Sequence, residues 1–401
     1  MHDVVIIGGG LVGSSLAIAL DGIGLKVALV ESAAPRVDAQ PSYDERNLVL
    51  ARASLNALQA LGVAEFYNGL TSPIERVHIS RRGDFGAVRI AADELDLPEL
   101  GAVIPARELG NALLKRLDRC VDLQRHAPAQ LVEIESFDDR VRLRLRSADG
   151  EAELQTRLLV GADGTHSMVR SHFGIGTSDT DYAQSAIVTT LMASRPLAGT
   201  AYERFTDSGP VALLPLTGGR AGLVLTVPSE DAGRIAALDD DAFIAFVHER
   251  FGYRAGRLTR PGKRKPYPLL RSLADRLTGS RMVLVGNAAQ TVHPLGAQGF
   301  NLGLRDALTL AEGLADVAAK TGDAGADSVL ADYAEARNDD RSATTSFSDD
   351  LVHLMASDTL PLRGLRSLGF LTLDRVPGLK RRVALRGMGF RGRTPAKALS
   401  P

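Results

Sequence analysis

The feature that most constrains the fold is a glycine-rich turn close to the N-terminus. Residues 4–7 form a short, continuous apolar run, which is typical of a parallel strand buried on both faces. Residues 8–13 then match the spacing G-x-G-x-x-G, and residues 11–23 have the small and apolar composition of a packed helix. A second apolar run, residues 26–30, ends at Glu31. This order predicts a β–α–β unit, and therefore an α/β fold with a parallel sheet.

The three glycines of this turn have different predicted roles. Gly8 permits the tight turn, Gly10 allows the backbone to approach a pyrophosphate, and Gly13 allows close packing of helix and strand. Glu31 lies 18 residues after Gly13, where a carboxylate can accept hydrogen bonds from ribose hydroxyls. The turn predicts a dinucleotide site, although a glycine-rich turn that binds nothing has the same pattern. The predicted contacts in the turn are Gly8, Gly10, Leu11, Val12 and Gly13.

Length and composition exclude several other classes of protein. A chain of 401 residues exceeds one typical core, so two domains, or one with a large insertion, are expected. The net charge of −1 does not favour nucleic-acid binding, and Cys120, the single cysteine, rules out an intramolecular disulfide or a cysteine-based metal site. No metal-ligand spacing joins the histidines either. We find no basic leader and no apolar run of about 20 residues. A cytoplasmic protein without a metal is therefore expected.

Two distant segments repeat the pattern of a strand followed by a polar turn. Residues 157–162 are apolar after Arg157 and run into Asp163 and Gly164. Residues 281–285 are apolar after Arg281 and run into Gly286 and Asn287, and a helical pattern covers residues 302–319.

The three segments, in this order, resemble the flavoprotein aromatic hydroxylase family over about residues 1–350. The resemblance implies an α/β fold with a Rossmann-like FAD-binding domain, a smaller antiparallel-sheet substrate domain and a helical C-terminal segment. It selects FAD as the cofactor, which the glycine turn alone does not. The sequence departs from the family pattern by having Asn287 where most members have Asp, Gln290 where many have His, and Gly296-Ala297 in inverted order.

The resemblance also implies site residues beyond the glycine turn. Asp163, Gly286 and Asn287 would lie near the ribityl chain, and the following loop would lie against the isoalloxazine ring. The helix beginning near Gly299 would direct its positive end toward the ring. Arg46 and Arg107 match family positions that contact the cofactor, although each could instead be a solvated arginine at a helix start. The loop residues implied are His293 and Pro294, as site-lining or catalytic groups, with Gly296, Gln298, Gly299, Phe300 and Asn301.

The G-N-A-A-Q sequence at 286–290, with residues 44–46 and 76–83, is most similar to the ubiquinone-biosynthesis branch, and within it to the 2-polyprenyl-6-methoxyphenol hydroxylases. This implies ring hydroxylation of a polyprenylated phenol. NAD(P)H would dock transiently and reduce the flavin, because only one dinucleotide fingerprint is present. O2 would then react at flavin C4a to give a hydroperoxide that hydroxylates the ring. A soluble small-phenol hydroxylase, a flavin reductase of isoprenoid chains and a non-catalytic prenyl-binding escort protein are the alternatives.

The implied domain organisation is discontinuous. Residues 1–75, 97–175 and 280–355 would form the FAD-binding domain, and residues 76–96 and 176–279 the substrate domain. Alternating patterns predict antiparallel substrate-domain strands at 187–193, 201–205, 211–215 and 221–227. A hairpin-rich excursion is predicted at 123–125, 129–136, 141–147 and 152–156.

Residues 356–401 form a basic C-terminal segment. From residue 361 onward there are 10 Lys or Arg and one acidic residue, about +9, so the preceding 360 residues carry about −10. Leucines recur among arginines at 362–371, which predicts a basic amphipathic segment. Such a segment could contact the inner membrane surface or other ubiquinone-biosynthesis enzymes. It could equally be a helix packed on the FAD domain with a solvated basic face.

Overall fold

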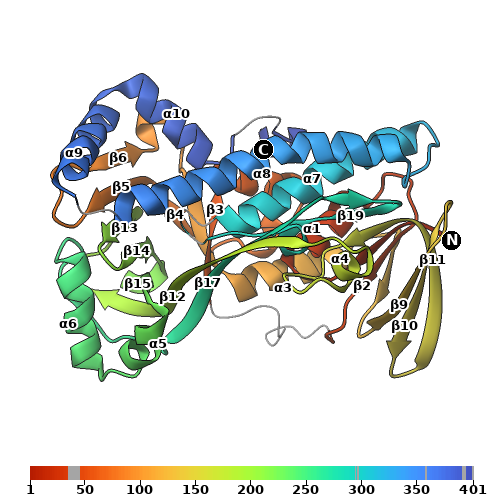
Figure 1. Cartoon of the computed structure of the whole chain (residues 1–401), viewed down its shortest axis with the longest axis horizontal. Helices are drawn as coiled ribbons and strands as arrows, with labels where there is room; N and C mark the ends of the chain where they lie inside the picture. The colour runs from red at the N-terminus through yellow and green to blue at the C-terminus, as the bar shows by residue number, and fades with distance from the viewer. Residues whose placement is uncertain (35–45, 294, 296–297, 357–358, 391–393, 400–401) are drawn as a thin grey trace.

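The computed structural model describes residues 1–34, 46–293, 295, 298–356, 359–390 and 394–399. Two large sheets lie at opposite ends of an elongated molecule, and long helices run between them (Figure 1). The first sheet has a parallel core in the order β19-β11-β1-β2-β8. Its strands are β1 (His2–Ile7), β2 (Val27–Val30), β8 (Leu123–His126), β11 (Gly150–Gly161) and β19 (Met282–Leu284).

The predicted β–α–β unit is present at the N-terminus. β1 and β2 pair in parallel, and both are almost wholly buried, as continuous apolar strands require. Helix α1 (Leu11–Ala19) connects them and packs against α3 (Ala106–Leu117) and α7 (Gln298–Ala319). Helix α1 is shorter than the predicted range 11–23, and α7 begins four residues before the predicted residue 302.

An antiparallel extension continues the first sheet. β9 (Gln130–Ser136) pairs with β10 (Val141–Ser147), which pairs with β11. The prediction of separate strands at 152–156 and 157–162 was wrong, because β11 runs unbroken from residue 150 to residue 161. Its first half belongs to the exposed hairpin and its second half to the buried parallel core. β18 (Thr278–Gly279) pairs antiparallel with β19 at the other edge.

The second sheet has the order β20-β17-β12-β15-β14-β13-β5-β6, and β16 also pairs with β12. Residues 76–96 contribute β5 and β6 at one edge of it. Helices α5 (Ser229–Ala236) and α6 (Asp240–Phe251) cover one face, where a separate apolar cluster forms. The strands are β5 (Arg76–Arg81), β6 (Val88–Ala91), β12 (Thr177–Ala193), β13 (Thr200–Thr206), β14 (Gly209–Pro215), β15 (Arg220–Pro228), β16 (Leu258–Thr259), β17 (Lys265–Ala274) and β20 (Gln290–Thr291).

A small third sheet lies between the two large ones. It has the order β3-β7-β4, formed by β3 (Asn47–Ala51), β7 (Gly101–Pro105) and β4 (Ser72–Ile74). The segment after Arg46 is therefore first a strand, and helix α2 (Arg52–Ala60) begins only after it. The short elements are α4 (Met168–His172), η1 (Ala64–Phe66), η2 (Asp93–Leu95), η3 (Thr217–Gly219) and η4 (Gly286–Ala288).

The C-terminal part of the chain is helical. Helix α8 (Asp327–Ala356) spans the length between the sheets and contacts α7, β18 and β13 (Figure 1). Helices α9 (Leu360–Arg375) and α10 (Pro377–Gly387) then pack beside β6, and α11 (Ala396–Leu399) returns to α2. Within the described residues, no helix combines the length and apolarity needed to cross a membrane.

Candidate cofactor site

The glycine turn is shaped by two close contacts and one opening. Gly8 has a φ of +104°, and a Cβ there would lie 2.4 Å from the carbonyl oxygen of Ala162. A Cβ on Gly13 would lie 1.9 Å from the carbonyl oxygen of Gly8, so helix and turn touch directly. A Cβ on Gly10 would have no heavy atom within 4 Å. Gly8 and Gly13 are therefore needed for packing, whereas Gly10 borders open space, as a pyrophosphate cradle requires.

Helix α1 begins at this opening. Gly10 is its N-cap residue and has no side chain to accept a hydrogen bond from the first turn. The N–H groups of Leu11 and Val12 have no acceptor within the helix, and the helix dipole adds partial positive charge there. This end of α1 can therefore bind an anion such as a phosphate group.

Glu31 follows β2 and braces the turn. Its Oε2 accepts a hydrogen bond from the backbone N–H of Gly9 at 2.7 Å, and its Oε1 accepts one from that of Ala33 at 2.7 Å. A small cavity opens beside it, lined by Gly9, Ser14, Leu29, Glu31, Leu114, Leu117, Arg125 and Ala127. Each carboxylate oxygen can accept a further bond, so the side chain can also meet a ribose hydroxyl.

The side chain of Asp163 accepts hydrogen bonds from the loop that follows it. Its Oδ1 accepts a hydrogen bond from Ser167 Oγ at 2.5 Å, and its Oδ2 accepts one from the N–H of Val169 at 3.1 Å. Nearby Arg170, for which the sequence motifs predicted no role, donates to the carbonyl oxygens of Thr165 at 2.8 Å and Ala288 at 2.9 Å. Asp163 and Arg170 thus hold the Asp163 loop against η4, and they position this part of the site.

The Gly286 segment touches the glycine turn through one side chain. A Cβ on Gly286 would lie 3.1 Å from Val12, and one on Gly303 would lie 2.7 Å from the same residue. Val12 therefore fills the space between η4 and α7, which brings the two motifs into contact. Asn287 is exposed, whereas Gly286 and Ala288 on either side are buried. Its amide can thus reach a ligand in front of the turn.

Asp306 organises this region, and the sequence analysis missed it. It is 2% exposed, and its Oδ2 accepts hydrogen bonds from Gly286 N at 3.1 Å and from Gln290 Nε2 at 2.5 Å. Its Oδ1 pairs with Arg337 Nε at 2.7 Å, which offsets the cost of burying the charge. Gln290, which departs from the family pattern, is therefore a partner of this carboxylate. The sequence does contain a signal for Asp306, because it places an acidic residue on the apolar face of the predicted 302–319 helix.

The loop before α7 holds His293 in the interior. His293 is 1% exposed, its Nδ1 accepts a hydrogen bond from Leu295 N at 3.1 Å, and its ring meets that of Tyr182 edge-on at 4.9 Å. Pro294 and Gly296 lie outside the described residues. A Cβ on Gly299 in the first turn of α7 would have no heavy atom within 4 Å, so this helix start also borders open space.

The remaining loop residues occupy packing positions. Gln298 is buried at the start of α7, and Phe300 is half-buried against the first core. The side chain of Asn301 bonds to the backbone of β3, accepting from Ala51 N at 3.0 Å and donating to Val49 O at 2.9 Å. Asn301 therefore fixes α7 on the third sheet.

Arg46 and Arg107 come together at one edge of the third sheet. The carbonyl oxygen of Arg46 accepts a hydrogen bond from the N–H of Ala106, the first residue of α3, at 2.8 Å. The guanidinium of Arg46 lies over the ring of Tyr267, and the side chain of Arg107 is 41% exposed beside Glu108. The backbones of the two segments are therefore adjacent, while the two side chains contact different residues.

Glu203 on β13 is a second acid that the sequence analysis missed. Its neighbours Tyr202 and Arg204 contact α6, through the ring of Phe251 and the carbonyl oxygen of Arg250. Glu203 therefore points to the opposite face, the same face as Phe205. Phe205 shares an apolar cluster with Leu295 of the His293 loop. Burial raises the pKa of Glu203 to about 7.

These features fit FAD. The carboxylate of Glu31 suits a ribose, the opening at Gly10 suits the pyrophosphate, the exposed Asn287 suits the ribityl chain, and the opening at Gly299 leaves room for the ring. Within the described part of the chain, no group of three His, Cys, Asp or Glu residues could hold a metal ion.

Curated relatives align over nearly the whole chain. A protein named ubiquinone hydroxylase UbiL, from Rhodospirillum rubrum, is 35% identical over 96% of this chain and 89% of its own length. The 3-demethoxyubiquinol 3-hydroxylase of Escherichia coli is 31% identical, covering 97% of this chain and 98% of the relative. The human mitochondrial ubiquinone biosynthesis monooxygenase COQ6 is 29% identical over 96% of this chain and 92% of the relative.

Solved structures have the same fold. The p-nitrophenol 4-monooxygenase PnpA of Pseudomonas putida superposes with a TM-score of 0.78 at 20% identity, covering 97% of this chain and 98% of that chain. PqsL of Pseudomonas aeruginosa, titled a probable FAD-dependent monooxygenase, superposes with a TM-score of 0.75 at 24% identity, covering 92% of this chain and 99% of that chain. Residues 1–348 match the family described as FAD binding domain. The chain therefore belongs to the FAD binding domain family of flavoprotein hydroxylases, in the branch that includes the ubiquinone hydroxylases.

Proposed function

We propose that the protein is an FAD-dependent monooxygenase that hydroxylates the aromatic ring of a polyprenylated phenol in ubiquinone biosynthesis, with NAD(P)H and O2 as co-substrates. The observation that carries the proposal is the convergence of two helix N-termini, those of α1 and α7, with the exposed amide of Asn287 between them. The names of the relatives from R. rubrum and E. coli supply the substrate class.

Each part of FAD has a matching group in this proposal. The first turn of α1 binds the pyrophosphate, and Glu31 accepts hydrogen bonds from the ribose. Asn287 bonds the ribityl chain through its amide, and the start of α7 at Gly299 lies by the ring. When bound, FAD supplies the redox chemistry that transfers an oxygen atom from O2 to the substrate.

The chain's own residues orient the reactants and exclude water. The N-terminal dipole of α7 favours negative charge on the ring that it faces. His293 is buried and packs against the ring of Tyr182 in the loop before α7. The apolar cluster that contains Leu295 and Phe205 excludes water beside this loop. Glu203, whose pKa is near 7, lies on the sheet face beside this cluster, where it can exchange a hydrogen bond or a proton with a phenol.

The substrate's tail favours a contact with lipid. A polyprenyl chain is apolar and resides in a bilayer, so a soluble enzyme that acts on it gains from being at the membrane surface. Peripheral contact with the inner membrane surface through residues 361–401 is therefore part of the proposal, and docking to partner enzymes is the other use of this segment.

The test is a reconstituted reaction with purified protein. We expect bound FAD near unit stoichiometry by absorbance, NAD(P)H oxidation stimulated by a prenylated phenol, and a product heavier by one oxygen atom drawn from isotopically labelled O2. Asn287→Ala should weaken FAD binding, whereas Asn68→Ala, at an exposed position that the site does not include, should not. Protein that stays colourless after incubation with FAD, or a substrate recovered unchanged, would contradict the proposal.

A further inference from the structure

Helix α9 leaves two leucines on its outer face. Leu365 and Leu368 are 63% and 62% exposed, whereas Arg366 is 4% exposed and Phe370 is 6% exposed on the inner face. A surface helix usually turns its leucines inward and its arginines to water. The outer face of α9 therefore presents apolar side chains that are a poor match for water.

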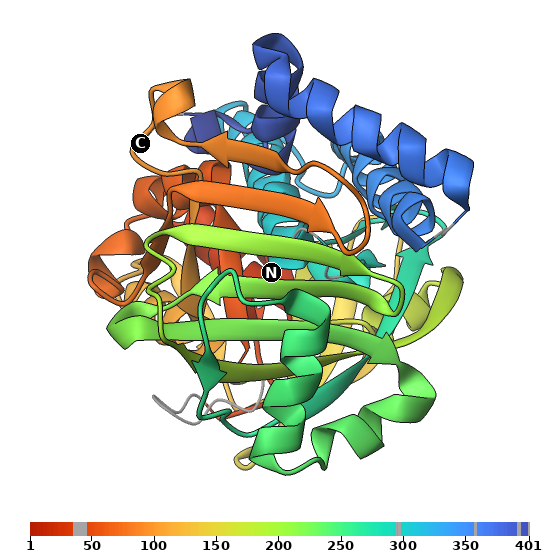
Figure 2. The same ribbon diagram turned by 90° about the vertical axis from the view of Figure 1, so that its left-hand side faces the viewer.

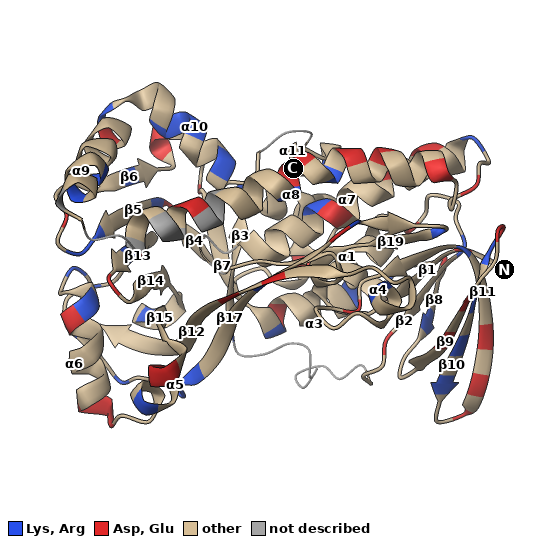
Figure 3. Cartoon of the chain, viewed as in Figure 1, with Lys and Arg blue, Asp and Glu red and all other residues tan. Residues whose placement is uncertain are grey.

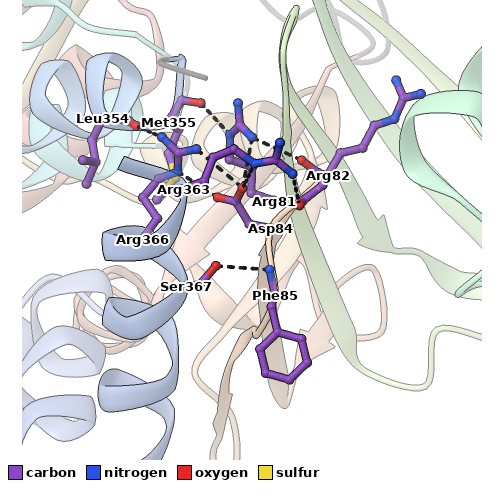
Figure 4. Close-up of polar contacts among 10 residues, drawn as sticks. Arg81, Arg82, Asp84, Phe85, Leu354, Met355, Arg363, Arg366 and Ser367 are labelled. Carbon is purple, nitrogen blue, oxygen red and sulfur yellow. Dashed lines mark hydrogen bonds and ion pairs between the residues drawn. The ribbon is translucent and has the colours of Figure 1, made fainter. Parts of the chain in front are cut away.

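The inward arginines bind a carboxylate from a distant part of the chain. Asp84, in the turn between β5 and β6, has a fully buried side chain and pairs with Arg366 at 2.8 Å, Arg81 at 3.3 Å and Arg363 at 3.4 Å (Figure 4). Three arginines exceed the charge of one carboxylate. The excess is met by carbonyl oxygens at the C-terminal end of α8, where Met355 O accepts from Arg81 and Leu354 O accepts from Arg366.

This buried cluster fixes the orientation of α9. Removing either partner of a buried ion pair leaves an uncompensated charge, which is strongly destabilising. Rotating α9 to bury Leu365 and Leu368 would break the Asp84 contacts, so the leucines are held outward by the structure itself. The free energy that their burial would contribute is therefore not gained in water.

Other apolar side chains extend the surface. Phe85 is 75% exposed, and its backbone N–H donates to Ser367 Oγ of α9 at 3.2 Å. Figure 4 shows its ring pointing away from the Asp84 cluster. Val376 and Leu379, at the start of α10, are 44% and 42% exposed. We define the α9–α10 face as Phe85, Leu365, Leu368, Arg375, Val376, Leu379, Arg381 and Arg382.

The charge of the α9–α10 face is positive. Arg375, Arg381 and Arg382 are exposed, and no ion pair joins them to an acid within the described residues. Two acids nearby are already paired: Asp374 with Arg89 at 3.1 Å, and Glu94 with Lys380 at 3.1 Å. Figures 2 and 3 show α9 and α10 at the periphery, with blue segments on α10.

We propose that the α9–α10 face docks on an anionic lipid bilayer, with Phe85, Leu365 and Leu368 entering the headgroup region and the arginines binding lipid phosphates. Apolar side chains rimmed by arginine match such an interface, where basic residues are attracted to the anionic headgroups. The inference deepens the proposed function by naming the surface of contact. It also refines the expectation from the sequence, since Arg363 and Arg366 bind Asp84 and Phe85 lies outside the tail.

The docked face leads toward the candidate site. Phe370, on the buried side of α9, belongs to the same apolar cluster as Phe205 and Leu295. An apolar layer therefore joins the underside of the face to the His293 loop, which suits an enzyme whose substrate carries a long apolar chain.

The test is partitioning of the full chain onto sedimented vesicles, without any turnover. We expect binding to vesicles that contain phosphatidylglycerol, weakened by salt, and little binding to pure phosphatidylcholine. Leu365→Ser/Leu368→Ser should lower partitioning at least tenfold, and Arg375→Gln/Arg381→Gln/Arg382→Gln should remove the preference for anionic lipid. Val121→Ser/Tyr253→Ser, which replaces residues 87% and 67% exposed elsewhere, is the matched control and should bind like wild type.

Three results would overturn the inference. They are no binding of wild type to anionic vesicles, equal binding by the leucine variant, and an equal loss in the control variant. A face that binds a partner enzyme instead would give the first result. The proposed function is judged separately, because FAD content and hydroxylation of a short-chain phenol in detergent do not depend on vesicles. The leucine variant should retain both.

Discussion

At the residue scale, the glycines of the first turn serve two separable purposes. Gly13 lies against the carbonyl oxygen of Gly8, whereas Gly10 borders open space. Gly10 has a φ of −67°, which alanine adopts without strain. A methyl group added by alanine should therefore affect packing at Gly13 and ligand binding at Gly10.

Gly10→Ala should leave the stability of the cofactor-free protein within about 0.5 kcal/mol and weaken FAD binding at least tenfold, because the methyl group occupies the space of the pyrophosphate. Gly13→Ala should lower the free energy of unfolding of the cofactor-free protein by roughly 1–3 kcal/mol, because the methyl group overlaps Gly8. Urea unfolding and flavin fluorescence titration measure the two effects. Equal FAD affinity for Gly10→Ala and wild type would count against the site.

Glu203 should make stability depend on pH. Burial raises its pKa from the ordinary 4.5 to about 7 in the folded protein, so the folded state binds the proton more tightly than the unfolded state. Its contribution to stability is complete below pH 4.5, falls between pH 4.5 and 7, and stays low above pH 7. At about 1.4 kcal/mol per unit, the upper bound is about 3 kcal/mol.

Glu203→Gln, which is neutral at every pH, should therefore be more stable than wild type at pH 8 and similar to it at pH 4.5. Urea midpoints of both proteins at these two values measure the difference. If the two proteins lost stability in parallel between them, the carboxyl group of Glu203 would not be the titrating group.

At the element scale, the buried parallel strands and the helices beside them were predictable. β1, β2 and the body of α7 follow from apolar patterns and from glycines whose spacing has a geometric reason. β11 was divided wrongly because its burial changes along its length, so an alternating pattern passes into a continuous one at residue 158. A hydrophobic pattern indicates which residues are buried, but it does not show directly where a strand begins and ends.

The backbone turns of the candidate site were predictable from the sequence, whereas most of its side-chain contacts were not. Motif order identified Gly10, Asn287 and Gly299, whose positions depend on local backbone geometry. The role of Asp306 depends on Arg337 from another helix, and that of Asn301 on the backbone of β3. Such contacts join residues far apart in sequence, so no local pattern contains them.

Helix α9 illustrates the same limit. The repeat of leucines among arginines predicted an amphipathic helix, and the structure contains one. Which face turns inward depends on Asp84, which lies 282 residues before Arg366. Periodicity therefore defines two faces but not their orientation.

At the scale of the whole molecule, α8 connects the cofactor site to the α9–α10 face. Near its middle, Arg337 binds Asp306 beneath the Gly286 turn. Near its C-terminal end, the carbonyl oxygens of Leu354 and Met355 accept from Arg366 and Arg81. Buried charged contacts at both places make separation of either sheet from α8 costly.

The two sheets should therefore unfold together, and FAD should stabilise both. With free FAD at 100 times its dissociation constant, the apparent stability should rise by about 2.7 kcal/mol, because the cofactor binds only the folded chain. Calorimetry should show one transition that shifts upward as FAD is added. Asp306→Asn should reduce the shift by weakening the cofactor site, and Asp84→Asn should lower the starting temperature of the transition with the shift preserved. Two transitions, of which only one responded to FAD, would mean that α8 does not couple the sheets.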